Sequence, residues 1–287
     1  MSADDLKPAR ADAMISVIIP AHNEADYISP CLEALLAQDA TAGQVEVIVV
    51  TNGCYDGTSE IARAHQSAFD AKGWPLTVYD LDQGSKPAAL NAGDVAATGM
   101  VRMYLDADIR CDPALLGQLQ VALAPPEPLY ATGRLALAPA RSPITRLYGA
   151  FWQTLPFNHT KAVGAGCYAV NAAGRARWET FPPIIADDSY ARLQFGPMER
   201  LEVTAPYHWP LAEGFAALVR VRRRQDAGMR ELFKTFPALA KNEAKPPVTL
   251  TYLLRALCKK PMAGLIYILV AITVRSRSTT PQWARGR

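Results

Sequence analysis

The sequence predicts an α/β fold in which helices cover both faces of a mixed, mostly parallel sheet, followed by a basic, helical C-terminal extension. Three observations support this expectation. Apolar, β-branched runs alternate with stretches of helical spacing over the first hundred residues, which is typical of parallel sheets. Polar clusters stand where these runs end. Basic residues are concentrated in the last quarter of the chain, around an apolar stretch.

The elements alternate regularly as far as residue 108. Strands are expected at 15–20, 45–50, 76–79 and 103–108. Helices are expected at 27–38, from Asp56 or Thr58 to about 69, and from Lys86 onward. Pro87 stands in the first turn of this last helix, where the missing amide hydrogen costs nothing. Ligands of such sheets bind beyond the carboxyl ends of the strands, where the polar clusters lie.

The last expected strand, 103–108, ends in Asp106 and Asp108. Residues i and i+2 of a strand point to the same side, so both carboxylates can leave the strand end together. Hard oxygen ligands of this kind suit Mg²⁺ or Mn²⁺ with the phosphates of a nucleotide. A solvated turn is the alternative for an isolated Asp-x-Asp. No Gly-x-Gly-x-x-Gly follows the first strand and no Walker-type loop occurs, which disfavours dinucleotide and P-loop folds.

Composition places the chain among ordinary globular proteins. It has 287 residues, of which 50% are hydrophobic and 20% charged. Five scattered cysteines without paired spacing favour a reduced, cytosolic compartment over a disulfide framework. Residues 1–13 are polar and lack an apolar core, which predicts a disordered leader and not a signal peptide.

Charge divides the chain into an acidic body and a basic tail. Residues 1–213 hold 15 Lys and Arg against 24 Asp and Glu, whereas residues 214–287 hold 15 against 3. Within the tail, the apolar stretch 262–274 lies between basic residues but is shorter than the roughly 18–20 residues that span a bilayer. This pattern favours an interfacial helix on an anionic membrane over a nucleic-acid partner. A packed core helix is the alternative.

Five motifs, in order and in register, resemble those of family 2 glycosyltransferases with the Rossmann-like GT-A fold. The motifs are Ile-Ile-Pro-Ala-His-Asn-Glu, Asn-Gly-Cys-Tyr-Asp-Gly-Thr, Lys-Pro-Ala-Ala-Leu-Asn-Ala-Gly, Asp-Ala-Asp, and a later Gly-Ala-Gly-Cys-Tyr-Ala-Val followed by Asp187-Asp188. The resemblance covers about residues 14–230. It implies an inverting transfer of a sugar from a nucleotide diphosphate donor to an acceptor hydroxyl. This reaction needs a cation to neutralise the leaving diphosphate and a base to take the acceptor proton.

The resemblance also implies roles for individual residues. Asp108 matches the metal-binding aspartate and Asp106 the aspartate nearer the ribose, with His208 a possible third metal ligand or a structural histidine. Asp188 matches the general base and Asp187 its acidic neighbour, although both also suit a helix N-cap. The nucleotide-binding positions are Pro20, His22, Glu24, Asn52, Asp56, Lys86 and Asp106. Asn52 stands where relatives commonly have an aspartate that accepts the uracil N3–H. Its amide oxygen can also accept that hydrogen bond, so UDP is favoured, while a simple turn role for Asn52 remains open.

The C-terminal arginines depart from the family pattern. The run 220–225 lies where processive relatives carry Gln-x-x-Arg-Trp, but no tryptophan follows, which argues against a processive synthase. These arginines either clamp a diphosphate or belong to a membrane-facing patch.

The resemblance and the charge pattern together predict how the chain is organised and where it works. A catalytic domain is expected at 14–215, with a nucleotide-binding half at about 14–110 and an acceptor half at about 111–215, before the basic extension 216–287. The expected partners are a nucleotide-diphosphate sugar, a saccharide or lipid-linked acceptor and an anionic membrane. The expected location is the inner face of the cell membrane. A catalytically silent binding subunit is the main alternative, and a nucleotidyltransferase a weaker one.

Overall fold

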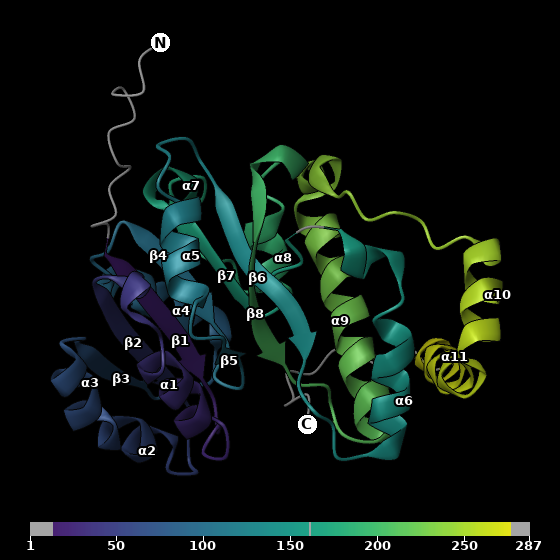
Figure 1. Ribbon diagram of the computed structural model, residues 1–287, viewed down its shortest axis with the longest axis horizontal. Coiled ribbons are helices and arrows are strands. Elements are labelled where there is room, and N and C mark those ends of the chain that lie inside the picture. Colours follow the sequence, from purple (N-terminus) through teal and green to yellow (C-terminus); the bar gives the residue numbers. More distant parts are fainter. Residues whose placement is uncertain (1–13, 161, 277–287) are drawn as a thin grey trace.

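The computed structural model describes residues 14–160 and 162–276 and contains a mixed eight-stranded sheet (Figure 1). The strand order is β3–β2–β1–β4–β7–β6–β8–β5. Strands β1 to β4 pair in parallel, as do β6 and β8, whereas β7 is antiparallel to β4 and β6, and β5 to β8. The strands are β1 Ile15–Ala21, β2 Val45–Asn52, β3 Leu76–Leu81, β4 Val101–Leu105, β5 Arg110–Cys111, β6 Tyr130–Leu137, β7 Cys167–Asn171 and β8 Arg200–Trp209.

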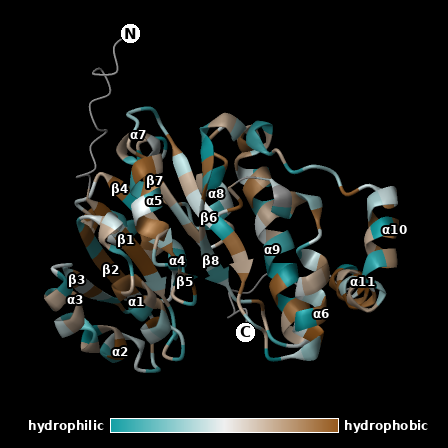
Figure 2. Ribbon diagram, viewed as in Figure 1, coloured by the Kyte–Doolittle hydropathy of each residue, from teal (hydrophilic) through white to brown (hydrophobic). Residues whose placement is uncertain are grey.

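Helices cover both faces of this sheet, as the sequence predicts. Alternate residues of β1 show the two faces: Val17 and Ile19 belong to a core cluster with α1 and α5, while Ile18 packs in a second cluster with α4 and α8. The central strands are correspondingly hydrophobic (Figure 2). The helices are α1 Ile28–Leu36, α2 Thr58–Ala64, α3 Gln66–Lys72, α4 Lys86–Ala96, α5 Leu115–Ala122, α6 Pro143–Trp152, α7 Ala172–Arg175, α8 Asp187–Arg192, α9 Phe215–Thr235, α10 Leu250–Lys259 and α11 Pro261–Arg275.

All four expected strands are present, but two boundaries differ from the prediction in ways that matter. The last of them, β4, ends at Leu105, so Asp106 and Asp108 lie in the turn that follows and not on the strand. The expected helix to residue 69 is divided at His65 into α2 and α3. The helix at Lys86 begins as expected, and the Ser85 hydroxyl accepts a hydrogen bond from the Ala88 amide as its N-cap. The expected leader, 1–13, lies outside the described residues.

The C-terminal helices form a third layer beside the sheet (Figure 1). Val270 and Val274 of α11 are buried in a cluster with Tyr148 and Phe151 of α6 and Leu218 of α9. The opposite side of α11 is exposed to solvent. The helix is therefore packed along one face, as the core-helix alternative requires, and open along the other. Within the described ranges, no helix is both long enough and apolar enough to cross a bilayer.

Candidate active site

A cavity of about 750 Å³ lies beyond the carboxyl ends of β1, β2 and β4, with α6, α8 and α9 forming its other walls. Most of the residues predicted from sequence meet there. They are Pro20, His22, Glu24, Asn52, Lys86, Asp106, Asp108, Asp187 and Asp188. Asp56 and His208 are not among the residues that line this cavity.

The loop after β1 is held in place by His22. Its Nδ1 donates a hydrogen bond to the Asn52 carbonyl at 2.5 Å, because a carbonyl oxygen can only accept. Its Nε2 then accepts from the side-chain amide of Asn23 at 3.2 Å. Asn23 itself has φ of 54°, and its amide oxygen accepts from the Tyr55 backbone. The histidine thus links the ends of β1 and β2 as a neutral tautomer.

The side chains of Asn52 and Asp56 act within the protein framework. Asn52 donates to the Ala21 carbonyl at 2.8 Å and accepts from the Ser85 amide at 2.9 Å, so its amide joins three segments. Asp56 accepts from the Ala25 amide and from the backbone and hydroxyl of Thr58. The turn interpretation of Asn52 therefore has structural support, whereas the uracil contact remains a prediction. Asp56 positions the loop that carries Glu24.

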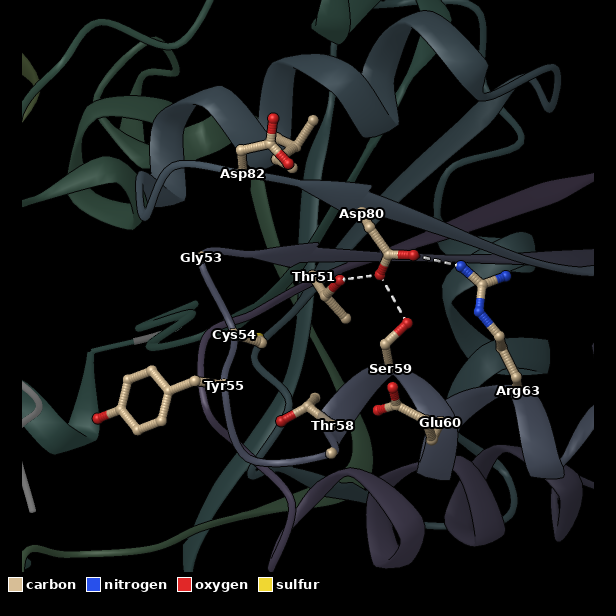
Figure 3. A pocket seen from close by; sticks show the side chains of 12 residues that line it. Thr51, Gly53, Cys54, Tyr55, Thr58, Ser59, Glu60, Arg63, Asp80 and Asp82 are labelled. Atoms are coloured by element: carbon tan, nitrogen blue, oxygen red, sulfur yellow. Dashed lines mark hydrogen bonds and ion pairs between the residues drawn. The ribbon is translucent and has the colours of Figure 1, made fainter.

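A smaller cavity of about 650 Å³ lies beside the loop that follows Asn52, between the ends of β2 and β3 and the start of α2 (Figure 3). Asp80 is the centre of its polar wall. It accepts hydrogen bonds from the hydroxyls of Thr51 and Ser59 and pairs with Arg63 at 2.5 Å. The Ser59 and Thr51 hydrogen bonds and the Arg63 charge outweigh partial burial and lower the pKa of Asp80. This network joins the ends of β2 and β3 to α2, and it thereby stabilises the loop that follows Asn52.

Lys86 connects the two groups of acidic residues in the larger cavity. Its Nζ lies 2.7 Å from Asp106 Oδ1 and 3.0 Å from Asp187 Oδ2. Burial alone would lower the pKa of Lys86, but the charges of Asp106, Asp187 and Asp188 outweigh it and raise the pKa. The ammonium is therefore a fixed positive charge between the turn after β4 and the start of α8.

The adjacent acids Asp187 and Asp188 differ in environment. Asp187 has a side chain only 7% exposed, and burial raises its pKa to about 6 against the opposing charge of Lys86. Asp188 is half-buried, and its Oδ1 accepts from the Ser189 amide at 2.6 Å. Both lie in the first turn of α8, after the N-cap Ala186, so the expectation that they cap the helix is wrong. Asp188 is the more accessible carboxylate.

The turn carrying Asp106 and Asp108 is fixed by Gly166. The Asp106 amide donates to the Gly166 carbonyl at 2.8 Å. Gly166 has φ of 64°, and an added Cβ would lie 2.6 Å from Asp106 Oδ2. A larger residue would therefore displace the carboxylate. The Gly-Ala-Gly motif of the later segment thus has a direct physical purpose at the site.

The predicted cation site at Asp106 and Asp108 would need further ligands from substrate phosphates. Across the described ranges, no three His, Cys, Asp or Glu side chains are grouped to hold a metal by themselves. Mg²⁺ commonly takes only one or two carboxylates together with phosphate oxygens and water, so two acids on one turn are sufficient. His208 lies on β8, opposite Arg110 of β5, between Tyr207 and Trp209. Its placement gives no support to a ligand role.

The rest of the cavity contains residues that sequence reasoning largely missed. Its wall is apolar and aromatic, with Tyr148 and Trp152 from α6, Trp209 from β8 and Leu218 from α9. It also carries four cations, namely Arg192, Arg222, Arg224 and Lys245.

The arginines of α9 divide between two environments. Arg224 faces the cavity, and no ion pair of its guanidinium is found within the described residues. Arg222 also lines the cavity, where it pairs with Asp226 at 3.2 Å. Arg223 instead donates to the Thr273 carbonyl at the end of α11. Arg222 and Arg224 thus line the cavity and Arg223 contacts α11, while the diphosphate clamp and the membrane-facing patch both stay predictions.

The chain is similar to known glycosyltransferases in sequence and in fold. The chain is 42% identical over 99 residues to glycosyltransferase AglE of Haloferax volcanii (34% of this chain, 31% of AglE) and 37% identical over 94 residues to an uncharacterised glycosyltransferase, alr2836, of Nostoc sp. (33% and 28%). The matched segments thus span about a third of these curated relatives.

Solved structures share the architecture at low identity. Mannosyltransferase PcManGT of Pyrobaculum calidifontis, in complex with GDP-Man and Mn²⁺, superposes with a TM-score of 0.58 at 21% identity, covering 96% of this chain and 80% of that one. TarS 1–349 of S. aureus with UDP-GlcNAc gives 0.55 at 15% identity, covering 87% and 81%. The fold is therefore of the GT-A type. The model of the family described as glycosyl transferase family 2 matches residues 16–178, and the chain belongs to that family.

Proposed function

We propose that the protein is an inverting glycosyltransferase that transfers a sugar from a nucleotide-diphosphate donor, with UDP favoured, to a hydroxyl of a saccharide or lipid-linked acceptor. The observation that carries this proposal is the convergence of Asp106, Asp108, Lys86 and Asp188 on one cavity of a family 2 chain. The acids supply a cation site and a base, which are the groups that this transfer requires.

The reaction is a single displacement at the anomeric carbon. The acceptor oxygen forms a bond to that carbon as the bond to the leaving diphosphate breaks on the opposite face, and Asp188 takes the acceptor proton. Asp106 and Asp108 would hold Mg²⁺ or Mn²⁺, which neutralises the leaving diphosphate when bound. Arg224 lines the same cavity and is proposed to contact the diphosphate.

Lys86 keeps the two parts of the site in register. Its contacts with Asp106 and Asp187 connect the donor turn to α8, at 2.7 and 3.0 Å. Asp187 is thereby engaged with Lys86, whereas Asp188 is left facing the acceptor side of the cavity. For this reason we assign the base to Asp188 and a positioning role to Asp187. The proposed catalytic unit includes α9, which extends beyond the boundary at residue 215.

The proposed activity is tested by incubating the protein with a panel of UDP-, GDP- and dTDP-sugars and Mn²⁺. Slow donor hydrolysis with one sugar nucleotide is expected, and Asp188→Asn should reduce transfer once an acceptor is found. Asp70→Asn, an exposed acid on α3, is the matched control. Failure to bind or turn over any donor would favour the silent-subunit alternative.

We further propose that α10 and α11 bind the protein to an anionic membrane at its cytoplasmic face. Apolar side chains are exposed along both helices: Leu250, Leu254, Met262, Leu265, Ile268, Leu269 and Ile272. Residues 244–276 contain five Lys and Arg and no acidic residue. Each cation near an anionic surface contributes on the order of 1 kcal/mol. Apolar burial and charge therefore act on the same surface.

Vesicle co-sedimentation tests this surface with the full chain. Binding to phosphatidylglycerol vesicles is expected, and it should weaken with added salt. The double variant Leu265→Ser/Leu269→Ser should reduce binding, whereas Val121→Ser, which alters an even more exposed apolar residue on α5, should not. Equal binding by all three proteins would reduce α11 to an ordinary packed helix.

A further inference from the structure

A second charged cluster lies at the acceptor end of the cavity. Arg192, the last residue of α8, places its guanidinium 3.0 Å from Glu243, and the Lys245 ammonium lies 3.5 Å from the same carboxylate. Two cations therefore share one acid. The Arg192 side chain is 9% exposed and that of Lys245 is 42% exposed, so Arg192 is held within the protein whereas Lys245 is accessible to solvent.

The surroundings of this cluster add positive charge. Arg200 is buried beside it and donates to the carbonyls of Phe195 and Asn242, which carry no net charge. Burial and the nearby Arg192 lower the pKa of Arg200 to about 10. The neighbouring acid Glu199 is engaged by Arg177 at 2.5 Å. The cluster thus has more cations than carboxylates, which is the electrostatic condition for binding an anion.

The position of the cluster relative to the base indicates which substrate it would contact. Arg192 follows Asp188 by four residues on α8, so the two side chains share one face of the helix. Partial burial and Arg192 lower the pKa of Lys245, while the charges of Glu243 and Asp188 oppose this change. Lys245 therefore lies within the electrostatic range of Asp188. The donor diphosphate, by contrast, belongs with Asp106 and Asp108.

We infer that Arg192 and Lys245 form an anion subsite that holds a phosphate group of the acceptor next to the hydroxyl that Asp188 deprotonates. This inference rests on the proposed function, because it assigns Asp188 to the acceptor side. The guanidinium offers paired donors to phosphate oxygens, and the more exposed ammonium can move to meet the ligand. The phosphate can belong to a lipid headgroup or to a water-soluble sugar or polyol phosphate.

The subsite is tested by titrating glycerol 1-phosphate into the full-length protein with its donor site filled by UDP and Mn²⁺. Binding is expected for the wild type and for Lys241→Gln, a control that alters an exposed lysine outside the cavity. Lys245→Gln should weaken it about tenfold, while leaving the affinity for UDP unchanged. Glycerol, which lacks the phosphate, should not bind.

Three results would overturn the inference: no binding of glycerol 1-phosphate by the wild type, equal binding by Lys245→Gln, or a parallel loss of UDP affinity in that variant. The last would place the cluster at the donor diphosphate. Because Arg192 is largely buried, Arg192→Lys with a thermal melting curve supplements Lys245→Gln. It should keep the fold and weaken phosphate binding through the loss of the paired donors.

One further experiment distinguishes a lipid headgroup from a water-soluble phosphate as the ligand. Another distinguishes failure of the subsite from failure of the proposed function. Phosphatidic acid vesicles that compete with glycerol 1-phosphate would support a subsite reached from a lipid surface, whereas binding without such competition would support a water-soluble acceptor. If UDP and all other donors fail to bind, the proposed function fails. The phosphate titration of Lys245→Gln against Lys241→Gln still tests the subsite in that case.

Discussion

The proposed donor and acceptor ends of the cavity differ in charge and in the elements that build them. The donor end is acidic, with Asp106 and Asp108 in the turn after β4 and loops from the parallel strands around them. The acceptor end is cationic and aromatic, with Arg192 and Tyr148 from helices outside the parallel half. Lys86 and Asp187 meet between them.

This difference separates chemistry that the fold presents generally from chemistry particular to this chain. Parallel strands bring their carboxyl ends to one edge, so any polar residue placed there joins a common site. Helices α6, α8 and α9 carry residues that meet only through tertiary packing. Gly228 of α9, for example, lets the segment just before α8 approach so closely that an added Cβ would lie 3.0 Å from Ile185. We therefore expect variants of the proposed metal-binding and base carboxylates to remove activity, and variants of the other acceptor-end residues to alter specificity.

The largest effect is expected for Asp108→Ala. Removal of this carboxylate should abolish transfer, because diphosphate would leave without a neutralising cation. Excess EDTA should have the same effect on the wild type, and added Mn²⁺ should restore only the wild type. Donor turnover is measured by release of the nucleoside diphosphate. Full turnover in EDTA would show that the acidic end acts without a metal, and the two ends would then not differ in this respect.

The next largest effect is expected at Asp188. Asp188→Asn keeps the shape of the side chain but cannot accept a proton, so the rate of transfer should fall roughly 10²–10⁴-fold with little change in donor affinity. Asp187→Asn should give a smaller loss of rate, since that residue contacts Lys86. The two variants are compared by kcat and by donor KM. A larger loss for Asp187→Asn would exchange the two roles.

Many residues of the donor end could be predicted from the sequence, but few of the acceptor end. Asp106 and Asp108 follow an apolar run, and the rule that ligands bind at strand ends places them correctly, although the strand stops at Leu105. Asn52 and Asp56 were predicted at the right edge, but their hydrogen bonds to backbone groups give them framework roles. A motif indicates where a polar residue lies, and only its neighbours determine what it contacts.

The acceptor end had few local signals. Lys245 lies in a segment between helices and reaches the cavity only because the chain returns across α8 after α9. Tyr148 lines the cavity on α6 while its ring stacks on Tyr267 of α11, at 5.4 Å between centroids. Such contacts depend on packing between distant segments. Arg192 was the exception, because its spacing of four residues from Asp188 on an expected helix could have indicated it.

The link between the two ends is tested by Lys86→Met. The variant leaves the carboxylates of Asp106 and Asp187 without their shared cation, which should raise the pKa of Asp187 above about 6. A buried acid whose folded pKa exceeds its unfolded value of about 3.9 loses stability as pH rises between the two values. In the wild type, the contribution of Asp187 should therefore lower the stability as pH rises to about 6. In the variant, this loss of stability should continue above pH 6.

Urea unfolding at pH 5 and pH 8 measures this effect. The destabilisation by Lys86→Met should be on the order of 3 kcal/mol at pH 8 and smaller at pH 5, where Asp187 is protonated more readily. Lys72→Met, which removes a partly exposed lysine of α3 that donates to the backbone carbonyls of Leu36 and Gln38, is the control and should show no such dependence on pH. Equal destabilisation at both values would mean that Lys86 stabilises the fold independently of Asp187.

The smallest effect is expected for Asp56→Ala, which alters a framework residue and no cavity wall. Asp56 joins the Ala25 amide to the start of α2 through Thr58, so its loss should cost roughly 1–2 kcal/mol of stability. The loop that carries Glu24 would be held less firmly, and donor KM should rise several-fold while kcat is nearly preserved. Urea unfolding and donor kinetics, compared with Asp70→Asn, measure both changes. A large fall in kcat would mean that Asp56 contacts the reacting groups, and the division between framework and cavity residues at the donor end would need to be redrawn.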